Sequence, residues 1–228
     1  MERRKLGNGP EVGAIGFGCM GMSEFYGETD DAQSLETLAH AFDAGVTLFD
    51  TADIYGFGHN ERLVGRFIRD KRDRVVIATK AGIVRVQDDP ARRGVDNSPA
   101  YLTEHCEASL ARLGTDHVDL FYLHRIDPAT PLEESIGTLA RLREAGKIRG
   151  IGLSNVTLET VLAAHSIHPV TAVQNEFSLF TRADQDRLLP ELARLGIGYV
   201  PYSPLGRGML TSGSQPGSLA DDDFRRNL

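Results

Sequence analysis

The chain has 228 residues, with 25 Lys and Arg against 32 Asp and Glu, and its formal net charge at neutral pH is −7. This balance argues against a nucleic-acid partner, because binding to phosphates needs a basic surface. An apolar share of 41% with 25% charged residues is typical of a packed globular domain and excludes a disordered chain. Apolar runs of only a few residues exclude a helix that spans a bilayer.

The N-terminal sequence and the cysteine content predict a cytoplasmic location. Residues 1–5 run into Leu6 and a Gly-Asn-Gly-Pro segment without the apolar core of a signal peptide. Cys19 and Cys106 are too few for a disulfide framework. We therefore expect a reduced protein that makes no contact with a membrane.

The chain opens with a predicted hairpin over residues 6–12, because Asn8-Gly9 supplies the positive φ angles of a two-residue turn. After it, short apolar runs alternate with segments of helical period. The runs expected to form strands are 14–18, 46–49, 75–78, 118–123, 150–153, 171–173 and 198–200. The segments expected to form helices are 30–43, 59–69, 98–113, 132–145, 157–166 and 184–195.

Continuous apolar runs indicate strands that are buried on both faces, and their alternation with helices predicts a parallel sheet. The first run is not followed by Gly-x-Gly-x-x-Gly, which argues against a dinucleotide-binding Rossmann domain. We expect an α/β fold, a (β/α)8 TIM barrel in a single domain over residues 1–228, with an N-terminal hairpin. The pattern gives seven strands and six helices, so the eighth βα unit is expected to be missing and the natural protein to be longer. The first and last strands would then each have an unpaired edge.

The active site of such a barrel lies at the carboxyl ends of the strands. Asp50, Lys80 and His124 each stand where an apolar run ends, and Tyr55 follows Asp50 closely. A free phenol has a pKa of about 10, so donating a proton near neutrality calls for lowering that pKa by roughly 2 to 3. One ammonium about 4 Å away is worth about 4 kcal/mol at an effective dielectric near 20. We expect Lys80 to lower the pKa of Tyr55, Asp50 to hold Lys80, and neutral His124 to donate to a substrate oxygen.

Several long motifs follow one another in a fixed order. The first motif covers residues 45–65: it begins with Gly-Val-Thr-Leu-Phe-Asp-Thr-Ala-Asp-Ile-Tyr-Gly and also contains Glu61 and Gly65. The second motif covers residues 109–124 and ends in Asp-Leu-Phe-Tyr-Leu-His. Gly-Leu-Ser-Asn at 152–155, Gln-Asn-Glu at 174–176 and Tyr-Ser-Pro-Leu-Gly-Arg-Gly at 202–208 continue the series. Over essentially its whole length the chain resembles the aldo-keto reductase superfamily, and most of all the microbial and plant branch that is similar to potassium-channel β subunits.

This resemblance implies reversible reduction of an aldehyde or ketone, a small-molecule carbonyl substrate, with NADP(H) as the cofactor. It implies a catalytic tetrad of Asp50, Tyr55, Lys80 and His124, with Tyr55 as the proton donor. It also implies contacts to the cofactor. Ser154, Asn155 and Gln174 would bind the nicotinamide carboxamide, and Tyr202 would stack on the nicotinamide ring. Ser203, Leu205 and Gly206 would lie along the pyrophosphate, with Gly208 in the same segment.

Other polar residues have simpler interpretations. Cys106 lies on an apolar helix face and is expected in the core, whereas Cys19 could line the site. We interpret the remaining motif residues, Glu61, Arg112, Asp116 and Asp119, as structural, and expect His59, His105, His117, His165 and His168 to face solvent or cap helices. The chain has no His-x-His at a strand end, so we expect no catalytic metal.

Residues 81–97 are long for a βα connection, where about 2 to 6 residues are usual. The segment is either a substrate gate or a mobile insertion. Residues that follow other strand ends are candidates for the wall of an apolar pocket: Phe25, Tyr26, Phe57, Arg125 and Ile126.

Two further functions remain open from the residues. Lys80 could form a Schiff base in an aldolase, because barrels host that chemistry. The resemblance to channel subunits also allows a nicotinamide-sensing module with little or no turnover.

Overall fold

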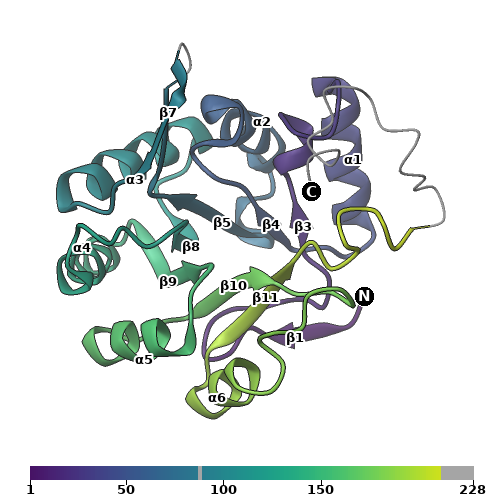
Figure 1. Ribbon diagram of the computed structural model, residues 1–228. Coiled ribbons are helices and arrows are strands. Elements are labelled where there is room, and N and C mark those ends of the chain that lie inside the picture. The colour runs from purple at the N-terminus through teal and green to yellow at the C-terminus, as the bar shows by residue number, and fades with distance from the viewer. Residues whose placement is uncertain (87–88, 212–228) are drawn as a thin grey trace.

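The computed structural model describes residues 1–86 and 89–211, and a seven-stranded parallel sheet curves around its centre (Figure 1). The strand order is β11-β10-β9-β8-β5-β4-β3. In chain order, the strands are β3 (Phe17–Gly18), β4 (Leu48–Asp50), β5 (Val76–Ala81), β8 (Val118–Leu123), β9 (Ile148–Ser154), β10 (Ala172–Glu176) and β11 (Gly198–Tyr202). Within the described residues β3 and β11 are the two end strands, so the predicted barrel of seven strands with open edges is confirmed.

Six α-helices of the described chain surround the sheet: α1 (Asp31–Asp43), α2 (His59–Ile68), α3 (Pro99–Leu113), α4 (Leu132–Glu144), α5 (Leu158–Ile167) and α6 (Leu188–Leu195). Helix α3 begins as its sequence predicts, because Ser98 accepts a hydrogen bond from the backbone N–H of Tyr101 and Pro99 takes the first helical position. Helix α6 begins four residues later than predicted. The carboxylate of Asp184 is bound by Asn175 and Tyr199, which ties residue 184 to the neighbouring strands instead of a helix.

The N-terminal hairpin pairs β1 (Arg3–Lys5) with β2 (Glu11–Gly13) in antiparallel fashion. The predicted two-residue turn is wrong: residues 6–10 separate the strands, and the left-handed residue is Gly7, with φ 58°. The loop is longer than two residues because its tip forms hydrogen bonds with the segment just before β11. Gly7 forms a bridge with Ile197, and the backbone N–H of Asn8 donates to the carbonyl of Gly196 at 2.7 Å.

The apolar core has two layers, one on each face of the sheet. The larger layer lies between sheet and helices, and the smaller one fills the barrel interior. The interior layer includes two side chains of the N-terminal hairpin; its members are Leu6, Val12, Leu48, Val76, Ala78, Leu120, Tyr122 and Ala172. Burial on both faces explains why the strands read as continuous apolar runs.

The Tyr122 side chain occupies the part of the barrel interior into which a side chain at position 152 on β9 would project. A Cβ atom on Gly152 would lie 2.2 Å from the Tyr122 ring, so only glycine leaves room for that ring. The ring is fully buried, and its hydroxyl has no hydrogen-bond partner among the described residues. Interior packing therefore depends on this pair of residues.

The long segment after β5 forms a second hairpin, in which β6 (Ile83–Val86) pairs with β7 (Asp89–Val95) in antiparallel fashion. Figure 1 shows this hairpin projecting beyond the sheet and helices. The predicted loop is thus an ordered two-stranded element over the part of 81–97 that the structure describes.

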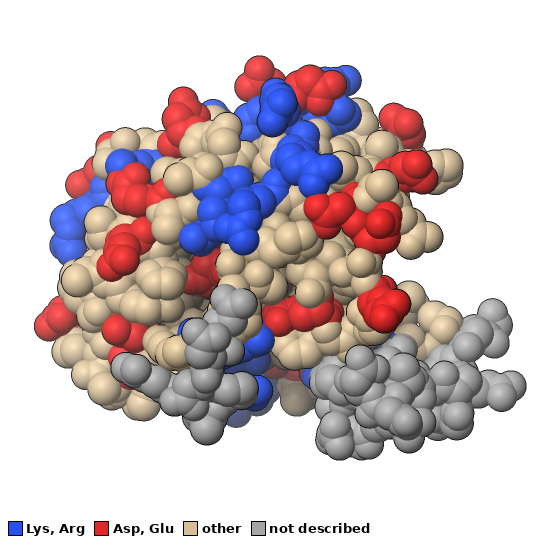
Figure 2. All heavy atoms as spheres, turned by 90° about the horizontal axis from the view of Figure 1, so that it is seen from above, with Lys and Arg blue, Asp and Glu red and all other residues tan. Residues whose placement is uncertain are grey.

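Basic and acidic side chains are interspersed on the face shown in Figure 2, without a continuous basic surface there. No helix within the described residues has both the length and the apolar character that a membrane crossing needs.

Candidate active site

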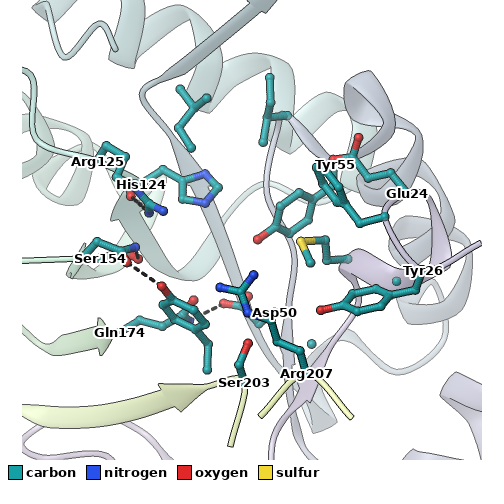
Figure 3. A pocket seen from close by; sticks show the side chains of 18 of the residues that line it. Glu24, Tyr26, Asp50, Tyr55, His124, Arg125, Ser154, Gln174, Ser203 and Arg207 are labelled. Atoms are coloured by element: carbon teal, nitrogen blue, oxygen red, sulfur yellow. Dashed lines mark hydrogen bonds between the residues drawn. The ribbon is translucent and has the colours of Figure 1, made fainter. Parts of the chain in front are cut away.

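A cavity of about 500 Å³ lies at the carboxyl ends of the strands. Its lining comes from β10 and from the last residues of β3, β4, β9 and β11, from the segments that follow β3, β4, β8, β9 and β11, and from the β6–β7 hairpin. Figure 3 shows two facing walls: Tyr55, Glu24 and Tyr26 lie on the first, and His124, Arg125, Ser154 and Gln174 on the second. Side chains far apart in sequence meet here because parallel strands end at one rim.

Lys80 is the most buried charged group of this site, with 1% of its side chain exposed. Its ammonium forms an ion pair with Asp50, donates to the Thr51 carbonyl at 2.8 Å and to the Tyr55 hydroxyl at 3.4 Å. The second Asp50 oxygen accepts a hydrogen bond from the Gln174 side chain at 2.9 Å. Burial would lower the pKa of Lys80, but the charge of Asp50 and the phenol of Tyr55 hold it above its usual value. Lys80 is therefore charged at neutral pH.

Tyr55 begins a short 3-10 helix, Tyr55–Gly58, and lines the cavity. Its ring meets the His124 ring edge-on, with 5.8 Å between ring centroids. Burial raises the pKa of the Tyr55 phenol, and the opposing charge of Lys80 only partly offsets that effect. The net shift is opposite to the sequence-based expectation, because burial outweighs the lowering effect of Lys80 and the charge of Asp50 adds to the rise.

His124 follows β8 directly, and its backbone N–H donates to the Ala81 carbonyl at 2.8 Å. Burial, together with the charges of Lys80 and Arg125, holds the pKa of the imidazole well below its usual range. The ring is therefore neutral at pH 7, with one donor and one acceptor nitrogen. Within the described part of the chain Nδ1 has no hydrogen-bond partner.

The structure thus brings Asp50, Tyr55, Lys80 and His124 together at one rim. Chemically, this arrangement presents the protonated phenol of Tyr55 next to the fixed Lys80 cation and the neutral His124 imidazole. The catalytic roles of these four residues stay predictions.

Three of the residues predicted to hold a cofactor, Ser154, Asn155 and Tyr202, form a hydrogen-bonded chain on the second wall. The Asn155 amide donates to the Ser154 hydroxyl at 2.7 Å, and the Tyr202 hydroxyl donates to the Asn155 amide oxygen at 2.7 Å. Six of the eight predicted contacts line the cavity, namely Ser154, Asn155, Gln174, Tyr202, Ser203 and Leu205. Gly206 and Gly208 lie in the same segment but do not line it.

Backbone strain is concentrated at this rim. Asn155, Ser203 and Arg207 have φ angles of 55°, 52° and 56°, and Phe25 has 77°, although none of them is glycine. Each such residue costs about 1 to 3 kcal/mol, and strain of this kind gathers at binding and catalytic sites. All four residues line the cavity.

Three of the five residues predicted for the apolar wall line the cavity: Phe25, Tyr26 and Arg125. Phe57 and Ile126 do not. The Phe57 ring lies against the guanidinium of Arg85, 4.8 Å from its centroid. Cys19 does not line the site either, because its side chain is fully buried in the layer between sheet and helices.

An ion pair that the sequence analysis missed joins the β6–β7 hairpin to the loop after β3. Arg85 contacts both carboxylate oxygens of Glu24, at 3.0 and 3.2 Å, and its guanidinium also lies near the Phe25 ring. Both charged residues line the cavity. No local signal could reveal the pair, since its members come from segments 61 residues apart.

A second missed pair joins helix α3 to the segment that follows β4. The His105 ring binds the buried Asp53 carboxylate at 2.6 Å and stacks on Tyr101 with 3.8 Å between centroids. Burial raises the pKa of Asp53, and His105 opposes that effect. His105 therefore has a buried acidic partner, which corrects the expectation that it only faces solvent or caps a helix.

The motif residues interpreted as structural are paired beneath the rim. Glu61 is fully buried and accepts hydrogen bonds from Thr79 and Arg112, both at 2.6 Å. Asp119 pairs with Arg72 at 2.8 Å. Asp116 is exposed and contacts the His117 ring.

Comparison with known proteins supplies the family. Residues 14–227 match the sequence pattern described as the Aldo/keto reductase family. Glycerol dehydrogenase from Gluconobacter oxydans is 31% identical, with a TM-score of 0.88 over 99% of this chain and 70% of that one. The holo form of an aldo-keto reductase from Bacillus halodurans is 29% identical, with a TM-score of 0.86 over 95% of this chain and 70% of that one.

A thermostable aldo-keto reductase, solved with the inhibitor epalrestat, is 33% identical, with a TM-score of 0.80 over 93% of this chain and 76% of that one. The sequence match and the structural likeness cover nearly the same residues. The chain belongs to the aldo/keto reductase family.

Proposed function

We propose that the protein reduces an aldehyde or ketone to an alcohol, reversibly and with NADP(H), and that Tyr55 donates the proton. Family membership supports carbonyl reduction by an oxidoreductase in general terms. The observation that carries the finer proposal is the contact of Tyr55 with Lys80, itself paired to Asp50, in the same cavity as His124.

The second wall fits a nicotinamide. When bound, this cofactor supplies the hydride. The side-chain amides of Asn155 and Gln174 and the hydroxyl of Ser154 are the donors and acceptors that a carboxamide needs, and all three line the cavity. The Tyr202 ring lines it as well and offers an aromatic face.

The chain's own residues account for the proton. The raised pKa of Tyr55 keeps its phenol protonated at neutral pH, so a proton is present for transfer to a carbonyl oxygen, while the charge of Lys80 opposes the rise that burial causes. The charge of Lys80 favours the phenolate that remains after donation. Neutral His124 can donate its N–H to the same oxygen without adding charge. Asp50 and the Thr51 carbonyl hold the Lys80 ammonium in place.

The competing aldolase hypothesis needs a neutral amine on Lys80, because only the free amine attacks a carbonyl. The pKa of Lys80 is raised, and its ammonium contacts three oxygen atoms. Both features favour a proton-tuning cation over a Schiff-base nucleophile.

The proposal places the protein in the cytoplasm. Both cysteines are free and buried, which is in keeping with a reducing compartment.

Steady-state oxidation of NADPH by the full chain, measured with a panel of aldehydes and ketones, tests the proposal. We expect oxidation that depends on the carbonyl compound and is slower with NADH. Tight NADPH binding without turnover on any member would favour the sensing module. A carbonyl substrate that borohydride traps covalently on Lys80, without any need for NADPH, would favour the aldolase.

A further inference from the structure

Arg125 has an unusual position in the cavity wall. It lies next to His124 on the rim, lines the cavity, and points its side chain along the wall that carries Ser154 (Figure 3). One guanidinium nitrogen donates to the His124 carbonyl at 2.8 Å. Among the described residues, no carboxylate lies within ion-pair distance of Arg125. A guanidinium has five N–H donors, so most of them are left for something else.

Three other cations of the site each have a carboxylate partner. Lys80 is paired with Asp50, Arg85 with Glu24, and Arg207 with Glu176 at 3.1 Å. Those pairs are neutral overall, so they do not attract an anion strongly. Arg125 is different because its positive charge is not balanced by a neighbouring carboxylate of the described chain.

The backbone around Arg125 is held firmly on both sides. Before it, the N–H of His124 binds the Ala81 carbonyl, and after it, the N–H of Asp127 donates to the Asn97 side chain at 2.8 Å. The Asp127 carboxylate in turn accepts from the N–H of Ala129 at 2.9 Å. The guanidinium therefore starts from a fixed point instead of a mobile loop.

A purely structural role would use the charge of Arg125 only to hold the end of β8. The electrostatics extend further, because the guanidinium adds to the effects of burial and Lys80 in lowering the pKa of His124. It also opposes the rise that burial causes in the pKa of Tyr202. The charge of Arg125 thus acts on both the His124 imidazole and the Tyr202 phenol, which line the cavity from different parts of the sheet.

We infer that Arg125 binds a carboxylate of the substrate, so that the preferred substrates are aldehydes or ketones that also carry a carboxylate. The inference rests on the proposed function and names the substrate class for it. The planar fork of a guanidinium matches the two oxygens of a carboxylate, and such charged hydrogen bonds are among the strongest in proteins. The adjacent His124 then meets the carbonyl end of the same molecule.

Matched substrate pairs test this directly in the full chain with NADPH. Succinic semialdehyde is compared with its primary amide, and 4-carboxybenzaldehyde with 4-carbamoylbenzaldehyde, because each amide keeps the shape and loses the charge. The variants are Arg125→Met, which removes the charge, and Arg125→Lys, which keeps it. Arg187→Met is the control, since Arg187 is 77% exposed and paired with Glu159 on the outer helices.

We expect the wild-type kcat/KM to favour the carboxylate over its amide in at least one pair. Arg125→Met should reduce that preference by about tenfold to a hundredfold, the value of a charged hydrogen bond. Arg125→Lys should retain part of it, and Arg187→Met should retain all of it. Equal kcat/KM values for both members of both pairs, unchanged by Arg125→Met, would overturn the inference and leave the proposed function intact.

Failure of the proposed function has a different signature. If no aldehyde is reduced, binding of 4-(hydroxymethyl)benzoate, followed by calorimetry, replaces turnover. Binding that is lost in Arg125→Met and kept in Arg187→Met would still support a carboxylate site. Binding that is absent in the wild type, or equal in both variants, would overturn it.

Discussion

The two walls of the cavity are built in different ways. Asp50 and Lys80 belong to strands β4 and β5, and Lys80 is almost fully buried with every contact made inside the protein. On the opposite rim, Asn155 and Ser203 have left-handed backbone, and Leu205 is 56% exposed. One wall is fixed by the sheet, whereas the other depends on strained loop residues that bond to one another.

This difference separates two tasks. The cation beside the proposed proton donor needs a fixed position, and the paired strands β4 and β5, which carry Asp50 and Lys80, provide it. A cofactor has to enter and leave, and loop residues with their own mutual hydrogen bonds can exchange those bonds for bonds to a ligand. We therefore expect substitutions in the first wall to affect turnover, and those in the second wall to affect cofactor affinity.

The largest effect is expected for Tyr55→Phe, which removes the proposed proton donor and keeps the ring. Turnover should fall by roughly 10² to 10⁴, the range for loss of general acid catalysis. The Kd for NADPH, measured by fluorescence titration, should stay within a few-fold. Tyr199→Phe is the control, because its hydroxyl binds Asp184 outside the cavity lining. Near-normal turnover in Tyr55→Phe would mean that another group donates the proton.

Rigidity of the sheet beneath the cavity is tested at Gly152 on β9. Gly152→Ala places a Cβ 2.2 Å from the buried Tyr122 ring, and overpacking of this kind costs about 1 to 3 kcal/mol of unfolding free energy. Urea unfolding provides the measurement. Gly137→Ala, inside α4 with only Arg141 near the new Cβ at 3.6 Å, should instead stabilise by about 0.5 to 1 kcal/mol. Equal stability of the two variants would contradict tight interior packing.

His124 predicts how stability changes with pH. Its folded-state pKa lies well below the unfolded value of about 6.5, so only the unfolded chain takes up this proton as the pH falls below that value. The unfolding free energy should then decrease by up to about 1.4 kcal/mol per pH unit.

His124→Gln removes this contribution, so urea unfolding between about pH 7 and pH 5 should show a shallower decrease than in the wild type. Above about pH 7.5 the two proteins should have parallel pH profiles, because the wild-type imidazole is neutral in both states there. Identical slopes at low pH would show that the buried imidazole is protonated in the folded protein.

The smallest effect is expected in the second wall. Tyr202→Phe removes the hydroxyl that donates to Asn155 at 2.7 Å, and one such hydrogen bond is worth about 1 kcal/mol. The Kd for NADPH should rise by roughly twofold to tenfold. A fall in turnover as large as that of Tyr55→Phe would erase the distinction between the walls.

The sequence predicts the strands well because burial on both faces leaves a clear pattern, and their ends predict that Asp50, Lys80 and His124 meet. It fails where tertiary contacts decide. The raised pKa of Tyr55 reflects burial and the nearby Asp50, neither of which can be read from local pattern. The ion pair of Arg85 with Glu24 joins segments far apart in sequence, so no sequence motif predicts it.

Tyr122 and the apolar side chains around it have a consequence for water. Within the described residues they form a buried cluster in which the Tyr122 hydroxyl has no hydrogen-bond partner, so this cluster offers no hydrogen-bonded relay for a proton. In the proposed reaction, the proton that Tyr55 gives away has to be replaced through the cavity mouth. Substrate, cofactor and proton then share one opening, and reprotonation of Tyr55 has to wait until that opening is accessible to solvent.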